Sequence, residues 1–477
     1  MEPLDGLDSA FLAMETPTSQ FHIAAVLVMD PPEGRRSLFS PSTRFAQIRR
    51  QVAQRIHLVP AFRQRAVPVP FGLGHPVWAD DPRFDLDDHL TRGALPAPGG
   101  LRELDQFVAD VVSRPLQRDR PLWEMVVVEG LEGGRTALVA KVHHAILDGV
   151  SGASLLASFF DLGPRVPPTP LAEPAWDPPP LPSAAQLLRR GTGSLARRQG
   201  VALSAWRGVL PAALGAAAER HRPGSVDGPV APFSAPRSPL NGAVSTRRRY
   251  ASLDVALGDV RQVRTAFGVT VNDVILACVG EALHHLLDRS GQLPDRSLVA
   301  MVPVSTRDQL DRRLGNRLSA FLVPLGTDLL DPVERLWAVA EASRTAKAHQ
   351  ARAGTRLLAD MADVSAPAIV AGLARSAGGL GVYDRLPPLA NVTVSSVPGP
   401  SFPIWCAGGR VAALRPAGPV AHGIGLNITT FSYEQTLSFG LLGCHRLVPG
   451  LDDLAILLDS ALGTLVMAAH QAQGRTG

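Results

Sequence analysis

The side chains of this chain best suited to chemistry are two adjacent histidines, an aspartate and a glycine in the stretch HHAILDG, residues 143–149. Imidazole titrates near neutral pH, so a histidine placed here could remove a proton from a substrate. Asp148 could orient that base, and Gly149 gives the loop a conformationally free turn. A proton-transfer site, a metal site and a pair of core histidines all remain compatible with this stretch.

The segments around this motif predict how it is positioned. Residues 136–142 are an apolar run typical of a buried strand, and residues 153–162 form an apolar helical stretch. An earlier strand, 123–128, is joined to the first by the turn GLEGG, which predicts a hairpin ending at the histidines. Because neighbours on an extended segment point to opposite faces, only one of the two histidines can face a substrate. The other would pack or hydrogen-bond as support.

Composition restricts the function classes. With 477 residues, 45% of them hydrophobic and 19% charged, the chain can bury a large core and is long enough for two or three domains. The formal charge of +4 is small, and Lys141 and Lys347 are its only lysines. This is not the footprint of a nucleic-acid-binding protein.

The cysteines and the N-terminal residues indicate the cellular compartment in which the protein is expected. The three cysteines, Cys278, Cys406 and Cys444, form no CxxC pair, which favours a reducing compartment over a disulfide scaffold or a zinc site. The acidic start MEPLDGLDSAFLAME lacks the basic region of a signal peptide. Because no long apolar run is free of charge and proline, we expect no transmembrane helix.

Strands and helices alternate on both sides of a proline-rich segment, which predicts an α/β fold of two domains with mixed sheets. We expect an N-terminal domain over 1–162, a linker over 163–245 and a C-terminal domain over 246–477. Within the linker, residues 184–222 are rich in Ala, Leu and Arg. They predict either a basic helix lying on an anionic membrane surface or a connector helix packed on the domains.

HHAILDG resembles the HHxxxDG motif of thioester-dependent acyltransferases related to chloramphenicol acetyltransferase and to peptide-synthetase condensation domains. Further motifs occur in the order found in the bacterial wax ester synthase/diacylglycerol acyltransferase family, and the chain resembles that family over nearly all its length except the linker. These motifs are LDSAFLAMETPTSQFHIAAV, DDPRFDLDDHL, RPLWEM, GVTVNDVILA, PVSTR, GNRLSAFLVPL, VPGP and FSYEQTLSFG. Ser396, where a second Asn is common before VPGP, departs from the family pattern, as do Gln117, Gln435 and Cys444-His445.

The resemblance implies two chloramphenicol-acetyltransferase-like domains with an active-site tunnel at their interface. It implies direct acyl transfer from a fatty acyl-CoA, used as a co-substrate, with no covalent acyl-enzyme. We expect no cofactor, and the lack of cysteine partners and of an HExxH spacing argues against a metal. His144 would be the general base and His143 its structural neighbour, while Asp148 and Gly149 would shape the loop. By resemblance to related acyltransferases, Asp148 would anchor the loop through a buried ion pair with Arg307 in the second domain.

Four further residues are candidates for the site or for its support. Asn272 could donate a hydrogen bond to the acyl carbonyl or the alcohol, or it could cap a helix, as Thr270 could too. Asp273 is expected to be structural. Trp123, in the PLW motif, is expected to be wall or core, with substrate contact as the alternative. Glu15 could lie near the acceptor or simply end a short helix.

We therefore expect an enzyme that transfers a fatty acyl group from acyl-CoA to a long-chain alcohol or diacylglycerol, giving wax ester or triacylglycerol. One alternative keeps the fold and the chemistry but uses a carrier-protein thioester or a specialised-metabolite acceptor. A second alternative is a non-catalytic lipid-binding protein. The expected location is the cytoplasm, with peripheral association on the inner membrane face or on lipid inclusions, and no nucleic-acid partner is expected.

Overall fold

The structure is a computed structural model that describes residues 2–32, 41–147, 158–164, 176–191, 230–305, 318–353, 372, 382–385 and 387–474. Two six-stranded mixed sheets dominate it, and a small sheet in the order β1-β4-β3 lies beside them. The expected α/β class with mixed sheets is confirmed. The small sheet consists of β1 (Glu2–Pro3), β3 (Gln64–Val67) and β4 (Val77–Asp80).

The first large sheet holds the predicted hairpin at its centre, in the order β12-β13-β2-β7-β6-β5. Neighbouring strands in this sheet are antiparallel, except that β5 and β6 are parallel. The first two strands in this order, β12 and β13, come from the C-terminal half of the chain. This sheet is therefore not built from the N-terminal half alone. Its strands are β2 (His22–Met29), β5 (Leu90–Ala94), β6 (Trp123–Glu129), β7 (Thr136–His143), β12 (Trp405–Cys406) and β13 (Gly409–Ala417).

The second large sheet has the order β10-β9-β11-β14-β15-β8. Strand β11 runs parallel to both β9 and β14, and the other pairs are antiparallel. The motif FSYEQTLSFG lies in a hairpin of β14 and β15 that turns at Glu434-Gln435. The strands are β8 (Arg248–Ala256), β9 (Val299–Ser305), β10 (Leu318–Pro324), β11 (Val392–Val397), β14 (Leu426–Tyr433) and β15 (Thr436–Cys444).

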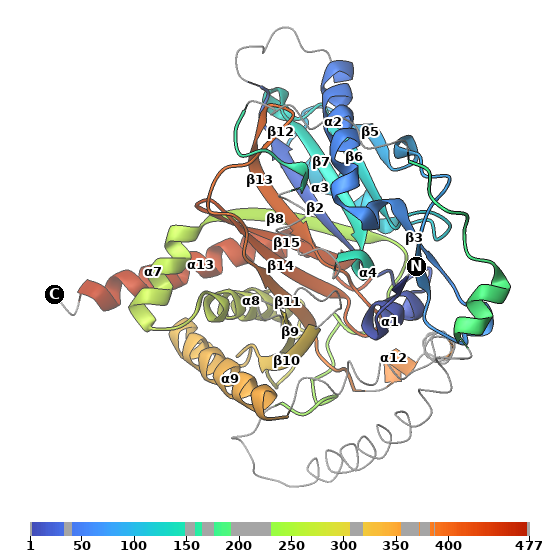
Figure 1. Ribbon diagram of the computed structural model, residues 1–477. Helices are drawn as coiled ribbons and strands as arrows, with labels where there is room; N and C mark the ends of the chain where they lie inside the picture. Colours follow the sequence, from blue (N-terminus) through green and yellow to red (C-terminus); the bar gives the residue numbers. More distant parts are fainter. Residues whose placement is uncertain are drawn as a thin grey trace.

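Helices α7, α8, α9 and α13 gather along the second sheet, away from the first sheet (Figure 1). Helix α8 is buried along most of its length, which explains its strongly apolar sequence. The α-helices are α1 (Gly6–Met14), α2 (Pro41–Arg55), α3 (Leu101–Ser113), α4 (His144–Leu147), α7 (Leu257–Phe267), α8 (Val271–Asp288), α9 (Pro332–Ala353), α12 (Val382–Arg385) and α13 (Leu451–Gly474). Short 3-10 helices are η1 (Ile56–Leu58), η2 (Pro60–Arg63), η3 (Pro70–Gly72), η4 (Leu86–Asp88) and η5 (Glu132–Gly134).

The two large sheets meet where β13 lies against β15. The backbone there is so close that a Cβ atom on Gly440 would lie 1.6 Å from the carbonyl oxygen of Pro416. Close by, the Tyr250 hydroxyl donates to the same carbonyl at 3.0 Å. Helix α3 of the N-terminal half also bonds the second sheet, because Asp105 accepts hydrogen bonds from the backbone N–H of Ser252 at 2.9 Å and from its hydroxyl at 2.8 Å.

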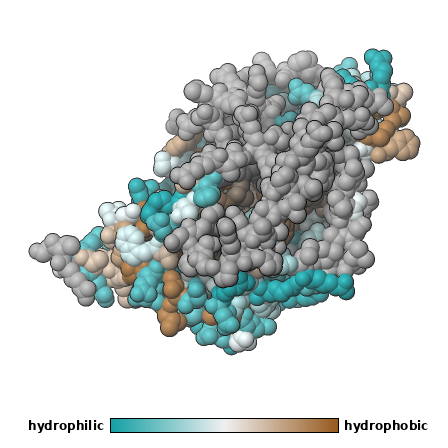
Figure 2. Space-filling view, turned by 90° about the horizontal axis from the view of Figure 1, so that it is seen from below, coloured by the Kyte–Doolittle hydropathy of each residue, from teal (hydrophilic) through white to brown (hydrophobic). Residues whose placement is uncertain are grey.

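Two expected helical stretches, 153–162 and 184–222, fall largely outside the described residues. Within the described residues, no single helix is long and apolar enough to cross a membrane, and the one pair that passes together, α7 with α8, is bent by 102°. On the described part of the face seen in Figure 2, apolar residues form separate patches among hydrophilic ones.

Candidate active site

The backbone fixes both histidines firmly at the end of a central strand. His143 is the last residue of β7 and pairs in register with His22 of β2. Its N–H donates to the carbonyl of Leu122 at 2.9 Å, and the N–H of His144 donates to the carbonyl of Phe21 at 2.8 Å. Helix α4 begins at His144. The motif therefore stands on the rigid mount that the predicted hairpin required.

A fully buried lysine strengthens this mount. Lys141, on β7, donates from Nζ to the carbonyls of Val111 at 2.9 Å and Arg114 at 2.7 Å, at the end of α3. The same ammonium lies 2.7 Å from a carboxylate oxygen of Glu124 on the neighbouring strand β6. Its charge thus binds carbonyls at the C-terminal end of a helix, and it ties α3 to the strand that carries the histidines.

His143 turns into the interior toward a buried carboxylate. Its Nε2 lies 3.6 Å from Oε2 of Glu15, and Nε2 of His22 lies 3.1 Å from Oε1 of the same carboxylate. Arg118 forms an ion pair with Glu15 from the more exposed side. Because Nδ1 of His143 accepts a hydrogen bond from the N–H of Ala145 at 3.1 Å, the ring proton belongs on Nε2, facing Glu15.

The electrostatics of this cluster follow from burial and pairing. Burial raises the pKa of the Glu15 carboxyl. Hydrogen bonds from His143 and His22 and the charge of Arg118 lower that pKa by more than burial raises it, so it lies well below its usual range. Burial lowers the pKa of His22 to about 4 and also lowers that of His143, against the opposing effect of Glu15. At neutral pH the cluster therefore holds an ionised carboxylate between two neutral imidazoles.

The ring of His144 has a different environment, because it faces an aromatic side chain instead of a carboxylate. The side chain is only partly buried, and its ring centre lies 4.8 Å from that of Phe11 on α1. Within the described residues, its Nδ1 has no hydrogen-bond partner. Burial, together with the nearby His143, lowers the pKa of His144 to about 4. A neutral imidazole with an unused nitrogen is therefore available at neutral pH.

Trp123 lies in the core. Its side chain is buried, its indole N–H donates to the carbonyl of Phe62 at 2.8 Å, and its ring stacks between those of Phe62 and His89. The PLW motif thus supports the hairpin beneath the histidines, through packing.

At the start of α8 the polar residues divide their tasks. Thr270 is the N-cap, accepting from the N–H of Asp273, while the carboxylate of Asp273 accepts from the N–H and hydroxyl of Thr270 at 2.9 and 2.7 Å. This is a capping box, so Asp273 has a structural contact and Asn272 is not the cap. Asn272 instead lines a pocket of about 620 Å³.

Asp148, Gly149 and Arg307 lie outside the described residues. The predicted ion pair between Asp148 and Arg307 therefore stays a prediction, as does the shape of the loop after α4. In the part of the chain that the structure does describe, no three His, Cys, Asp or Glu side chains are placed to hold a metal ion.

His22 and Arg118 were missed as members of the cluster. His22 stands only at the start of an apolar strand in the sequence, and Arg118 lies in a polar turn among several other arginines. A signal for His22 existed in the sequence, since a strand that begins with histidine can bring that ring beside the last residue of an antiparallel neighbour that ends in histidine. No local pattern indicates Arg118.

The fold and the histidine pair together define a class of protein, the acyltransferases built on two mixed sheets with a histidine motif at a strand end. A trichothecene 15-O-acetyltransferase from Fusarium sporotrichioides shares this fold with a TM-score of 0.61 at 10% identity, covering 97% of this chain and 94% of that one. A wax ester synthase/diacylglycerol acyltransferase from Marinobacter aquaeolei VT8 matches with a TM-score of 0.69 at 30% identity, over 98% of this chain and 100% of that one.

Sequence comparison narrows the class. Residues 4–275 match the wax ester synthase/diacylglycerol acyltransferase catalytic domain, and residues 314–465 match the C-terminal domain of the same family. The chain belongs to the wax ester synthase/diacylglycerol acyltransferase family. Two relatives from Mycobacterium tuberculosis, both named provisionally as diacylglycerol O-acyltransferases, are 37% identical over 91% of this chain and 90% of the relative, and 35% identical over 98% and 90%.

Proposed function

We propose that this protein transfers a fatty acyl group from acyl-CoA to the hydroxyl of a long-chain alcohol or a diacylglycerol, giving wax ester or triacylglycerol, with His144 as the general base. The observation that carries the proposal is the state of His144: a partly buried, neutral ring whose Nδ1 has no partner in the described part of the chain, held at the end of β7. Family membership supplies the reaction class.

The chemistry needs one base and one set of donors. The alcohol donates its proton to a ring nitrogen of His144 as its oxygen attacks the thioester carbonyl carbon. The carbonyl oxygen becomes an oxyanion, toward which Asn272 is our candidate donor. When the tetrahedral intermediate collapses, the C–S bond breaks, the coenzyme A thiolate leaves, and it can take the proton held by His144. No acyl-enzyme is required.

The other predicted residues are given supporting roles. His143 and Glu15 position the loop from below, since their contacts are with each other and with His22. Asp148 and Gly149 would shape the loop above His144, and Arg307 would anchor Asp148. Because both products are lipids, we place the protein on the inner membrane face or on lipid inclusions when it works.

The test measures release of coenzyme A from palmitoyl-CoA while hexadecanol, diacylglycerol and water are compared as acceptors. His144→Ala should lower transfer to the lipid acceptors by about 10²–10⁴-fold, the usual contribution of a general base. His470→Ala, an exposed histidine on α13, is the matched control and should leave the rate unchanged. Full transfer by His144→Ala would refute the assignment of the base, and turnover only with water would refute the acceptor class.

A further inference from the structure

A pocket of about 620 Å³ opens in the second sheet region, beside the start of α8. We propose that it binds the phosphate-bearing end of the acyl donor, the 3′-phosphate and 5′-diphosphate of a coenzyme A thioester. This inference rests on the proposed function, because it names the part of the chain that would hold the donor of that reaction.

The walls of the pocket come from several elements. Helix α7, the first turn of α8 and strands β9 and β10 line it together with the ends of β11 and β14 and with one residue of α9. The lining residues are Leu257, Arg261, Arg264, Thr270, Val271, Asn272, Val302, Pro303, Val304, Phe321, Lys347, Ser396, Val397, Pro398, Ser432 and Leu437.

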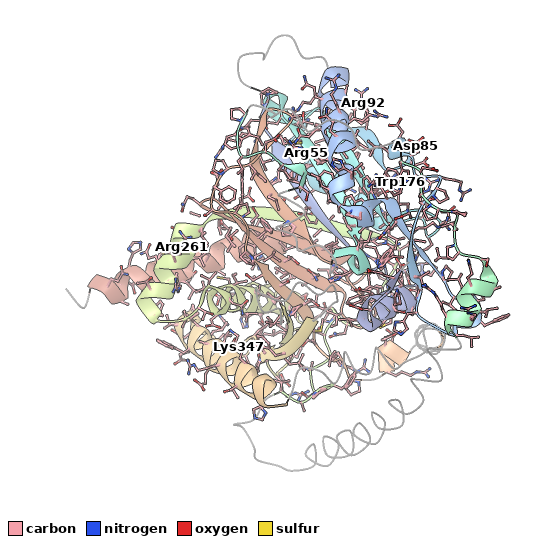
Figure 3. The ribbon with its side chains drawn as sticks, viewed as in Figure 1. Arg55, Asp85, Arg92, Trp176, Arg261 and Lys347 are labelled. Atoms are coloured by element: carbon pink, nitrogen blue, oxygen red, sulfur yellow. The ribbon has the colours of Figure 1, made fainter. Side chains whose placement is uncertain are left out.

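All the charged side chains that line the pocket are positive. Arg261 and Arg264 from α7 and Lys347 from α9 reach it, and it contains no Asp or Glu. Arg261 and Lys347 are labelled on their two helices in Figure 3. Among the described residues, none of these three cations has a salt-bridge partner. Three cations around one cavity repel each other, and a polyanion bound between them would remove that repulsion.

The rest of the lining suits the remainder of such a ligand. Phe321, Val302 and Val304 give the pocket an apolar wall, against which an adenine ring or a pantetheine arm could pack. The Nζ atom of Lys347 lies 5.8 Å from the centre of the Phe321 ring, so charge and apolar surface are adjacent. A ligand with a charged end and an apolar body fits this combination better than inorganic phosphate does.

Strand β14 and Asn272 connect this pocket with the hydrophobic core and with the candidate donor of the reaction. Ser432, near the end of β14, lines the pocket, while its neighbours Phe431 and Tyr433 pack against the core cluster that contains Ala145 and Ile146 of α4. Asn272, the candidate donor of the reaction, is itself part of the lining. A thioester whose phosphates lie between the three cations would therefore place its pantetheine arm beside Asn272, the candidate donor of the proposed reaction.

The first experiment compares two donors that differ only in their phosphates, palmitoyl-CoA and palmitoyl-pantetheine. Arg264→Gln and Lys347→Gln should each raise KM for palmitoyl-CoA about tenfold, with kcat changed less than about twofold, because one charge-assisted contact is lost in ground and transition states alike. KM for palmitoyl-pantetheine should not change. Arg289→Gln, an exposed cation at the other end of α8, is the matched control. An equal rise in KM for both donors would overturn the inference.

The second experiment separates this inference from the proposed function. Equilibrium binding of free coenzyme A is measured by calorimetry with the His144→Ala protein, which needs no turnover. The Arg264→Gln and Lys347→Gln substitutions should weaken that binding about tenfold and leave binding to phosphatidic acid vesicles unchanged. Weakened vesicle binding with unchanged coenzyme A binding would assign the pocket to a lipid headgroup and overturn the inference. A wild-type protein that binds coenzyme A but transfers no acyl group would contradict only the proposed function.

Discussion

Glu15 keeps its negative charge between two neutral histidine rings, and this arrangement separates the roles of the adjacent His143 and His144. The carboxylate lies 3.6 Å from Nε2 of His143, and the hydrogen bond from the N–H of Ala145 to Nδ1 fixes the tautomer of that ring. His144 is left without such a partner, so nothing in the described surroundings competes for its Nδ1. Substituting Glu15 would therefore remove the charged partner that His143, His22 and Arg118 share.

The lowered pKa of His144 predicts an unusual pH profile. Burial and the neighbouring His143 lower that pKa to about 4, so the ring is already neutral at pH 5. The acid limb of kcat/KM should therefore lie near pH 4, where an ordinary histidine base would give a limb near pH 6.5. Initial rates between pH 4.5 and 8, restricted to conditions where circular dichroism shows an intact fold, test this. A tenfold fall in kcat/KM between pH 6.5 and 5.5 would contradict it.

At the residue scale, the sequence predicts those features of the site whose residues lie close together in the chain. The histidine pair, the strand beneath it and the capping residues of α8 follow from types and spacings a few residues long. His22 and Arg118 reach Glu15 only when distant segments pack, so no spacing indicates them. The sequence alone is compatible with Trp123 as wall, core or substrate contact, and the stacking of its ring with Phe62 and His89 places it in the core.

Helix α3 illustrates the scale of the element, since it connects the histidine strand to the second sheet. Lys141 binds its final carbonyls, and Asp105 on the opposite side binds Ser252 of β8. Burial raises the pKa of Asp105 to about 7, although the hydrogen bonds from Ser252 lower it in part. The contact between α3 and β8 therefore contains a carboxyl that titrates near neutral pH.

The sign of this effect on stability is fixed by the raised pKa. The folded state keeps a proton on Asp105 that the unfolded state releases near pH 4, so stability falls as pH rises through 7. Relative to Asp105→Asn, the wild-type protein should lose about 1.4 kcal/mol of unfolding free energy between pH 6 and pH 8. Urea titrations of both proteins at each pH measure the difference. A constant difference across this range would show that Asp105 titrates elsewhere.

Most elements were predictable because their periodicity is strong and local. The hairpins and α8 appear where their patterns indicate, with ends shifted by a few residues. Strand β13 was not predicted, because GRVAALRPA has neither clean alternation nor a continuous apolar run. It becomes a strand by pairing with β2, nearly four hundred positions earlier in the chain (Met29 pairs with Val411).

At the scale of the whole molecule, the close approach of the two large sheets sets the geometry between the histidine motif and the pocket. Gly440 leaves no room for a Cβ atom against Pro416. Gly440→Ala should therefore force the sheets apart and destabilise the protein by about 3 kcal/mol. Denaturant unfolding measures this, and Gly258→Ala on α7, where nothing lies within 4 Å of the new methyl group, is the control and should be neutral or slightly stabilising. Equal stability of the two variants would contradict the close contact.

The division of the chain into 1–162, 163–245 and 246–477 remains a prediction. The two sheets justify two centres of folding, but strands β12 and β13 of the later segment belong to the sheet of the earlier one. Domain boundaries drawn along the sequence therefore do not coincide with the membership of the two sheets. Sequence patterns indicate local helices and strands, and they do not indicate which sheet a strand joins.

Strand β13 also determines when the first sheet can be completed during synthesis of the chain on the ribosome. The strand carrying the histidines emerges early, but its neighbour β2 keeps an open edge until residues 409–417 have been synthesised. Through most of translation that edge is a row of unpaired amides and carbonyls, the kind of surface that recruits strands from other chains. A fragment ending at residue 275, the limit of the matched catalytic domain, would keep this edge permanently. It would therefore be prone to aggregate however well its own helices and strands form.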